Sequence, residues 1–312
     1  MTREWSFKPA EFIPFRDTEA IERVTRITKA DMAKHANPDY RITVMPDAEV
    51  GFRWVTDMFH RIWLAGEEGR KVVLITPNPA RSYMRVAYLI NKFRVDCKHV
   101  YTFNMDEYAD EEGQTAPESW PLGFMRAFKE YFWSQIDPEL RPPEEQMQGP
   151  TTGNINDYSK MIVDAGGADV CYSGPGWTGH VAFVEPDAPE FQAEDVQQFL
   201  KMGARICRLS PFTIAQNSLH GSFGSSGNLC AVPPMAATIG PADVVAAKNR
   251  IDIHSLTVHG SFASWQRLTT RLCLHGPVTP LVPTSILQLM RTDVWVSETL
   301  AEDVKPRWEL EY

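Results

Sequence analysis

The chain has 312 residues, of which 43% are hydrophobic and 23% are charged, a balance that excludes disordered and collagen-like proteins. Its net charge of -9 comes without a basic run, and nucleic-acid binding needs a cationic surface, so no nucleic-acid partner is expected. The length predicts one large domain or two ordinary ones.

Residues 1–40 differ in pattern from the rest of the chain and are predicted to be an N-terminal extension. Their first stretch, MTREWSFKPAEF, is charged and lacks the apolar region of a signal peptide. An Asp17/Thr18 cap then opens a helix that is predicted to run from Thr18 to about His35. From Arg41 the pattern becomes regular, so residues 41–312 are predicted to form one α/β domain.

The predicted domain alternates apolar runs with amphipathic stretches. The apolar runs have the composition of buried parallel strands and lie at 42–45, 71–75, 100–103, 168–172, 256–258 and 294–296. The stretches with helical periodicity lie at 52–62, 82–93, 118–133, 156–165, 261–274 and 284–290. Strands that alternate with helices predict a Rossmann-like open parallel sheet with helices on both faces. Residues 135–154 and 186–230 are predicted to be irregular.

Cysteine usage and hydropathy indicate where the protein works. The five cysteines are widely spaced and form no CxxC pair, so neither structural zinc nor a disulfide framework is predicted. No window approaches the about 20 apolar residues of a membrane helix, so no membrane partner is expected. These features predict a cytoplasmic protein with reduced, mostly buried thiols.

Polar and glycine-rich segments come directly after three of the predicted strands, at 76–82, 104–108 and 173–180. Ligands bind outside the carboxyl ends of parallel strands, where neighbouring loops diverge. We therefore expect a paired carboxylate, a glycine turn and a histidine to meet at one crevice.

The paired carboxylate is formed by Asp106 and Glu107, which come directly after a buried strand. Shielding from water raises the pKa of a carboxyl group toward neutrality, and such a group can act as a general base. In the structural alternative, Asp106 caps the following helix and Glu107 pairs with a basic residue. Residue chemistry alone favours neither interpretation.

The glycine turn contains Gly174, Gly176 and Gly179 and ends in His180. Glycines let the backbone approach a ligand closely and point amides at it. Glu185 comes five residues later, and a carboxylate can fix the tautomer of an imidazole. The turn lies in mid-chain and precedes an apolar stretch, so it does not fit a dinucleotide-binding fingerprint.

Three further features also have ordinary structural interpretations. Trp177 lies inside the turn, where it can stack on a sugar ring, although most tryptophans are core or interface residues. His254 and His259 bracket a predicted strand with an odd spacing, which puts them on opposite faces, so no metal site is predicted. The Ser/Gly-rich stretch 217–226 is predicted to be a solvated loop.

Together these motifs resemble the glucosamine-6-phosphate deaminase (isomerase) family, with order and approximate spacing kept from about residue 41 to about residue 300. The matching segments are TFNMDEY at 102–108, PES at 117–119, GxGxxGHxAFxEP at 174–186, PxxAxTxG at 233–240 and SxLQL at 285–289. The resemblance implies the α/β fold of that family and a homo-oligomer. It also implies that no organic cofactor and no catalytic metal take part.

The resemblance assigns roles to three residues. In that family the aspartate matching Asp106 moves a proton between C1 and C2 of the open-chain sugar through an enediol. The histidine matching His180, with the glutamate matching Glu185, assists ring opening before ammonia leaves C2. Proton transfer by a positioned group contributes roughly 10²–10⁴-fold. The residues predicted to bind substrate are Thr76, Asn78, Arg81, Glu107, Gly174, Gly176, Trp177, Thr178 and Gly179.

The chain departs from the family pattern at one catalytic position and at the positions that bind the substrate's phosphate. Thr178 stands where the family has an aspartate, and a hydroxyl supplies a hydrogen bond but no charge. The family's phosphate loop is glycine-rich, whereas residues 76–82 hold two prolines and no glycine. Proline lacks the amide donor that a phosphate cradle depends on. Leu219 and Ala263 stand near the family's phosphate-binding arginine and lysine.

Other cations are candidates to replace the two missing phosphate ligands, namely Arg81 and the pair Arg205/Arg208.

The leading hypothesis is an isomerase or deaminase that acts on a small sugar, amino sugar or sugar phosphate. One alternative is a non-catalytic sugar-binding or regulatory paralogue, suggested by Thr178 and the altered loop. The other is a sugar lactonase, as in the related 6-phosphogluconolactonases.

Overall fold

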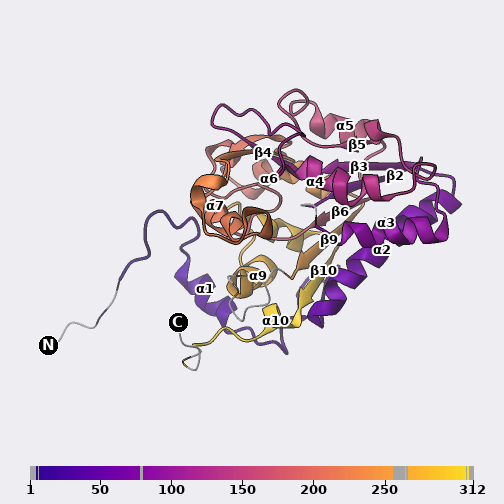
Figure 1. The fold of residues 1–312 in the computed structure, drawn as a ribbon. Helices are drawn as coiled ribbons and strands as arrows, with labels where there is room; N and C mark the ends of the chain where they lie inside the picture. Colours follow the sequence, from indigo (N-terminus) through magenta and orange to yellow (C-terminus); the bar gives the residue numbers. More distant parts are fainter. Residues whose placement is uncertain are drawn as a thin grey trace.

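The computed structural model describes residues 5, 7–77, 80–255, 264, 266–306 and 308. Its centre is a seven-stranded sheet with the order β1-β10-β9-β6-β2-β3-β5, and every neighbouring pair is parallel (Figure 1). The strands are β1 (Tyr40–Met45), β2 (Val72–Thr76), β3 (Val100–Asn104), β5 (Met147–Gln148), β6 (Val170–Ser173), β9 (Asn249–His254) and β10 (Thr292–Ser297). The predicted open parallel sheet is confirmed.

Helices cover both faces of the sheet, as the apolar runs predict. Along β2, Val73 and Ile75 belong to one buried core cluster, whereas Val72 and Leu74 belong to another. The helices with residues in the second cluster are α2 (Asp47–Glu67), α3 (Tyr83–Phe93) and α4 (Phe124–Tyr131). The first cluster includes residues of α5 (Tyr158–Asp164), α9 (Gln266–His275) and α10 (Glu298–Ala301). Two separate cores therefore hold the sheet from its two sides.

A second, three-stranded antiparallel sheet was not predicted. It has the order β4-β8-β7 and consists of β4 (Asp106–Ala109), β7 (Arg205–Arg208) and β8 (Met235–Thr238). These strands are short, and β4 and β7 are rich in charged residues, so they carry no strong strand pattern of their own. Asp106 of β4 pairs with Thr238 of β8, far along the chain, and local sequence patterns do not report such a contact.

The prediction of irregular structure at 186–230 was therefore wrong in part. The segment contains α6 (Val196–Phe199), β7 and α7 (Pro211–Ser218), together with the 3-10 turns Pro189–Phe191, Gly221–Phe223 and Leu229–Ala231. The expected solvated loop at 217–226 begins inside α7, where Asn217 and Ser218 are buried. Residues 135–154 are closer to the prediction, with the short 3-10 turns Trp133–Gln135 and Glu144–Gln146 before β5.

Other elements differ from the prediction at their boundaries. The helix that opens at the Asp17 cap is α1 (Thr18–Thr25) and stops well before His35, whose ring instead packs 4.7 Å from that of Tyr40. Helix α4 begins at Phe124 rather than at Glu118, and residues 284–290 form the 3-10 helix Pro283–Leu289. The strand predicted at 256–258 lies outside the described residues, while β9 just before it was missed.

Helix α1, in the segment that the sequence predicts to be an N-terminal extension, packs against α9 (Figure 1). The fully buried side chain of Arg271 on α9 donates to the carbonyl of Ile27 at 2.9 Å and to the carbonyl of Ala301 at 3.0 Å. Arg23 of α1 donates to the carbonyl of His275 at 2.9 Å. None of the described helices combines the length and hydropathy needed to cross a bilayer.

Candidate active site

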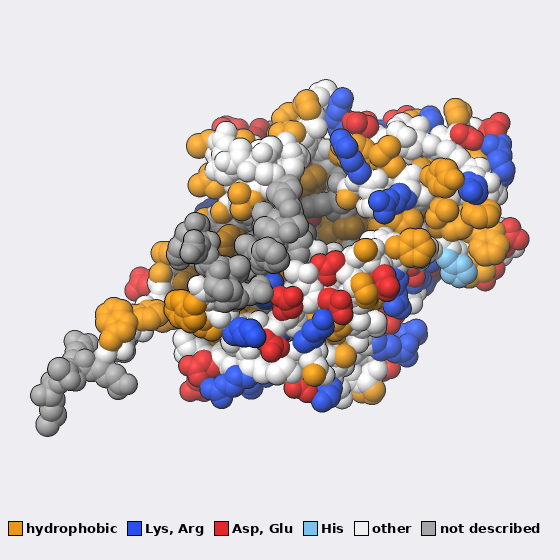
Figure 2. All heavy atoms as spheres, turned by 60° about the horizontal axis from the view of Figure 1, so that its bottom comes forward, with side chains coloured by type: hydrophobic (Ala, Val, Ile, Leu, Met, Phe, Trp, Pro, Cys, Tyr) orange, Lys and Arg blue, Asp and Glu red, His pale blue; other side chains and the backbone are white. Residues whose placement is uncertain are grey.

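A cavity of about 250 Å³ opens at the carboxyl ends of the central strands. The segments that come after β2, β3, β6 and β9 contribute to it, as the fold rule predicts. Figure 2 turns the lower side of Figure 1 forward and shows this face hollowed near its middle, with hydrophobic side chains beside the hollow. The described residues that line the cavity are Val50, Gly51, Trp54, Pro77, Ala80, Ser82, Tyr83, Met105, Asp106, Ser173, Gly174, Pro175, Gly176, His180, Ala182, Phe183, Gln216, His220, Ile253 and Ser255.

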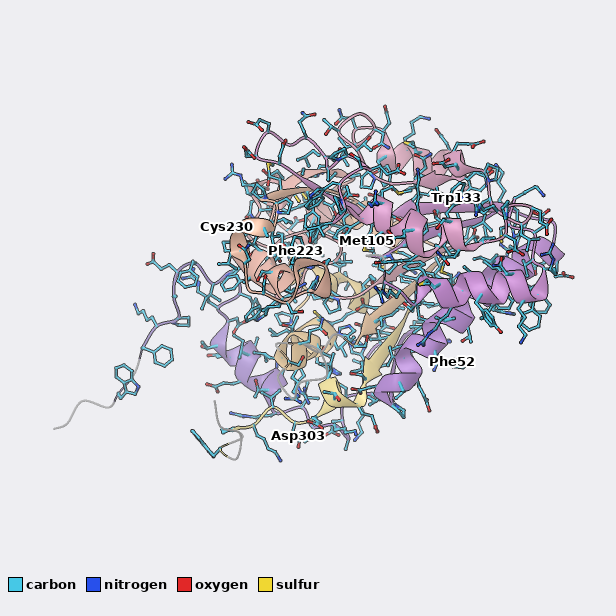
Figure 3. All side chains as sticks on the ribbon, viewed as in Figure 1. Phe52, Met105, Trp133, Phe223, Cys230 and Asp303 are labelled. Carbon is cyan, nitrogen blue, oxygen red and sulfur yellow. The ribbon has the colours of Figure 1, made fainter. Side chains whose placement is uncertain are left out.

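Asp106 is the only carboxylate among these described lining residues. It begins β4 directly after Met105, which Figure 3 labels near the centre of the molecule, and it is 3% exposed. Burial raises the pKa of Asp106 well above its usual range, and the neighbouring charge of Glu107 adds to this. Within the described ranges, no group donates a hydrogen bond to this carboxylate. A buried carboxyl group without donors is a stronger base than a solvated one.

Glu107 has a different, structural place. Its Oε1 accepts from the amides of Tyr108 at 2.9 Å and Phe124 at 3.0 Å, and its Oε2 accepts from Met125 at 2.8 Å. Its carboxylate therefore caps the N-terminus of α4, where unpaired amides favour negative charge. Glu107 does not line the cavity, and the cap expected of Asp106 in the structural alternative belongs to Glu107 instead.

His180 lines the cavity and is held through its Nδ1 atom. The hydroxyl of Thr178 lies 3.1 Å from Nδ1 and donates to Oε2 of Glu185 at 2.9 Å. Because that hydroxyl has one proton, which Glu185 receives, the oxygen of Thr178 is left as an acceptor for a proton on Nδ1. Thr213 lies 3.1 Å from the same atom. The arrangement favours the tautomer in which Nδ1 carries the proton and Nε2 carries a lone pair.

The buried carboxylate of Glu185 also acts on the imidazole directly. Its Oε1 lies 3.2 Å from Nδ1 of His180 but makes no hydrogen bond, so the contact is electrostatic. Nε2 makes no hydrogen bond to any residue that the structure describes. The Glu185–Thr178–His180 network thus supplies both the negative charge and the orientation that the sequence comparison with the family left open at Thr178.

The three glycines of the turn are needed for packing. A side chain at Gly176 would place its Cβ 2.0 Å from Nε2 of His180, and one at Gly174 would lie 2.5 Å from the carbonyl oxygen of Ile253. Gly179 has a φ of +79°, in the left-handed region that favours glycine. Gly174 and Gly176 line the cavity, whereas Gly179 lies on the other side of the turn.

In the described part of the loop after β2, Thr76 and Arg81 do not line the cavity. Thr76 is fully buried, and its hydroxyl donates to Oδ1 of Asn104 at 3.0 Å, which ties β2 to β3. Asn78 lies outside the described residues. Arg81 is exposed and is not among the cavity residues, although Ala80 and Ser82 beside it are.

The other candidate cations also lie away from the cavity. Arg205 donates to the carbonyl of Glu190 at 2.7 Å, and Arg208 lies 3.7 Å from the carboxylate of the same residue. Leu219 does not line the cavity, and Ala263 is outside the described residues. No lysine or arginine is present among the described lining residues. Residues 78–79 and 256–263, which the structure does not describe, contain none in their sequence.

Trp177 faces away from the cavity. It is 40% exposed and lines a second, apolar groove of about 220 Å³ together with Ile13, Phe15 and Phe212. Its backbone amide donates to Oε1 of Gln216 at 2.7 Å, so the turn is anchored to α7. The side chain is therefore not in position to stack on a ligand in the cavity.

Sequence reasoning missed several lining residues. Gln216 and His220 come from the segment expected to be irregular, and no motif distinguishes them. Trp54 and Tyr83 lie on predicted helices, and their rings pack edge to face at 4.7 Å. The aromatic character of both was visible in the sequence, but only the packing of α2 against α3 shows that they meet at the cavity.

The described residues hold no group of three or more His, Cys, Asp or Glu side chains suited to a metal ion. His254, considered as a ligand, is fully buried and pairs through Nε2 with Asp252 at 2.7 Å and through Nδ1 with Thr270 at 3.1 Å. Its other candidate partner, His259, is outside the described residues.

Comparisons with known proteins agree with the fold and the motifs. No family model matches the chain. The glucosamine-6-phosphate deaminase of Mannheimia succiniciproducens is 28% identical over 227 residues, which are 70% of this chain and 73% of that protein. A monomeric glucosamine-6-phosphate deaminase has the same fold, with a TM-score of 0.68, 18% identity and coverage of 83% of this chain and 98% of its own.

A third match is more distant. The 6-phosphogluconolactonase of Leishmania guyanensis aligns with a TM-score of 0.57 and 12% identity over 86% of this chain and 99% of its own. This likeness concerns the fold. The sequence matches to the deaminases go further than the fold, because the first of them extends over 70% of this chain at 28% identity. The chain is therefore similar to glucosamine-6-phosphate deaminases in sequence and in fold, at identities that mark it as a diverged relative of these proteins.

Proposed function

We propose that the chain is an isomerase or deaminase that acts on a sugar or amino sugar and moves a proton between C1 and C2 through an enediol. The observation that carries the proposal is that Asp106 and His180 line one cavity. Removing a proton next to a carbonyl requires a positioned base. The raised pKa of Asp106 makes its carboxylate a stronger base for this step than a solvated aspartate would be.

His180 serves the ring-opening step in this proposal. With Nδ1 protonated, the lone pair of Nε2 takes the proton of the anomeric hydroxyl and delivers it to the ring oxygen as the C1–O5 bond breaks. The imidazolium formed in between is stabilised by the carboxylate of Glu185, 3.2 Å from Nδ1. Thr178 keeps the ring in the required tautomer.

Solvent exchange tests the proposal. The protein is incubated in D₂O with glucosamine, glucosamine 6-phosphate and the matching neutral sugars, and deuterium at C2 is followed by NMR. Ammonia release then separates a deaminase from an isomerase. Asp106→Asn should abolish the exchange while the protein stays folded, and Asp164→Asn, at an exposed site on α5, is the matched control. Unchanged exchange in Asp106→Asn contradicts the assignment.

The lactonase alternative draws on the fold shared with 6-phosphogluconolactonases. A buried base in the same cavity as a histidine can also activate water toward a lactone carbonyl. Acid release from sugar lactones, without exchange at C2 of any sugar, would favour this activity. Sugar binding with neither reaction would favour the non-catalytic paralogue, against which the complete Glu185–Thr178–His180 network argues.

The proposal also covers partners, location and assembly. Its partner is a small sugar or sugar phosphate, and the cytoplasmic location rests on composition. Self-association rests on the resemblance, although the solved deaminase with the same fold is monomeric. Sedimentation of the purified chain at two concentrations measures that state directly.

A further inference from the structure

Two parts of the cavity lining differ in chemistry. The polar groups Asp106, Ser173, His180 and Gln216 come from the ends of β3 and β6, the glycine turn and α7. Another part of the lining consists of Val50, Trp54 and Tyr83, which come from α2 and α3 and belong to the core cluster on that face of the sheet. We call these three residues the apolar wall.

The apolar wall offers no donor to a charged ligand. The ring of Tyr83 packs edge to face on Trp54 at 4.7 Å, and its hydroxyl already donates to the carbonyl of Pro77 at 3.1 Å. The indole nitrogen of Trp54 is buried without a hydrogen bond, so it presents no accessible donor. Val50 has no polar side-chain atom. These three side chains therefore offer hydrocarbon and aromatic contacts to a ligand.

An anionic ligand would be poorly placed here. The described lining residues include no lysine or arginine, and Asp106 is their one acidic group. A phosphate dianion would lose its hydration and face a carboxylate without a compensating cation. An apolar substituent would instead be stabilised by its transfer from water to contact with the apolar wall.

We propose that the substrate is uncharged at the end away from its reacting carbonyl and carries an apolar group there, which packs against the apolar wall. This inference rests on the proposed function, because Asp106 and His180 define the reacting end. It adds the substrate class, a neutral sugar or amino sugar with a deoxygenated, alkylated or aromatic substituent.

Binding of inert open-chain analogues tests the inference. The 2-amino-2-deoxyglucitols have no carbonyl and cannot react, so calorimetry with the full chain reports affinity alone. Four are compared, which carry at C6 a hydroxyl, a phosphate, a hydrogen or a benzyl ether. The benzyl ether should bind at least about tenfold more tightly than the 6-hydroxyl compound, a free energy of about 1.4 kcal/mol. The phosphate should bind more weakly than the hydroxyl.

Each other outcome has a defined meaning. Phosphate binding as tight as that of the hydroxyl compound, or a benzyl ether no better than it, overturns the inference and leaves the proposed function standing. If none of the four binds at millimolar concentration, the proposed function itself is contradicted, and this inference with it.

Two pairs of variants locate the effect. Trp54→Phe should reduce the benzyl advantage at least about threefold, whereas Trp63→Phe, at an exposed position of the same helix, should leave it unchanged. Gly51 lines the cavity and has open space beyond its Cβ, so Gly51→Lys is tolerated and should raise phosphate affinity, while Gly51→Leu should not. Equal effects within either pair overturn the inference.

Discussion

The imidazole of His180 occupies the space that a side chain at Gly176 would need. The amide of Gly176 donates to the carbonyl of His180 at 3.3 Å, and a Cβ at Gly176 would lie 2.0 Å from Nε2. The turn therefore folds the histidine back over its own glycine, with Nδ1 held by Thr178 and Thr213. The position of the imidazole ring therefore depends on glycine at position 176 as much as on the hydrogen bonds of Nδ1.

Gly176→Ala should displace the imidazole and lower the rate of solvent exchange at the substrate's C2 by about 10²-fold or more, the contribution of one positioned proton-transfer group. Overpacking should cost about 1–3 kcal/mol of stability, measured by denaturant unfolding. Gly153→Ala is the control, because its Cβ would lie an ordinary 3.7 Å from Thr151. Full activity in Gly176→Ala would show that His180 is not used.

The hydroxyl of Thr178 is predicted to set the tautomer of His180. Thr178→Val keeps the shape but leaves Oε2 of Glu185 without its donor, which costs about 1–3 kcal/mol for a buried group. Turnover should fall about tenfold or more, since Nδ1 loses one of its two hydroxyl partners. Thr178→Ser retains the hydroxyl and should stay near the parent rate. Equal rates for the two variants would remove Thr178 from the mechanism.

The buried carboxyl group of Asp106 predicts a pH-dependent stability. Its pKa is raised by burial, so the folded protein favours the protonated form, and the stability that this form gives is lost as pH rises from the unfolded pKa through the folded one. Asp106→Asn removes that loss. The variant should therefore gain in Tm over the parent as pH rises from about 4 toward neutrality. A Tm difference that is flat across this range would contradict the raised pKa.

Glu107 is predicted to act on stability and not on turnover. Glu107→Gln replaces one acceptor oxygen with an amide group that faces backbone N–H donors of α4. Loss of such a buried cap should cost about 1–3 kcal/mol in urea unfolding, while kcat of the folded variant stays within about twofold. Glu112→Gln, at an exposed position, is the control. A large fall in kcat without loss of stability would indicate that Glu107 takes part in the reaction.

The sequence predicts the parallel sheet well because each central strand is buried on both faces. Runs such as 71–75 therefore stay apolar whatever their neighbours are, and their periodicity needs no tertiary information. β4, β7 and β8 could not be predicted in this way, since they are short and are stabilised by pairing with each other across the chain.

The residues of the candidate site also differ in whether local sequence patterns could predict them. Asp106 and His180 come after buried strands, so fold rules bring them together. Trp177 lies within the same turn, yet the left-handed φ of Gly179 and the anchoring of the turn to Gln216 direct it to another groove. The role of Thr178 depends on a hydroxyl lying between two side chains, which spacing along the chain does not reveal.

The last prediction concerns the N-terminal extension. Arg271 is fully buried and donates to carbonyl groups from three parts of the chain, those of Ile27, Arg267 and Glu302. A planar guanidinium reaches these acceptors in different directions at once, whereas a lysine ammonium presents all its donors from one atom. The same helix donates from Thr269 to the carbonyl of Trp177 at 2.9 Å, so the extension is linked to the glycine turn.

Arg271→Lys should therefore lower the free energy of unfolding by about 2–5 kcal/mol, because buried carbonyls lose their donors while a buried charge remains. Limited proteolysis should cut residues 18–39 before the rest of the chain, and solvent exchange at C2 should slow as α9 loosens its hold on the turn. Arg85→Lys, at an exposed position on α3, should change none of these. If Arg271→Lys unfolds like the parent and the extension stays protected, residues 1–40 are an appendage whose docking does not support the site.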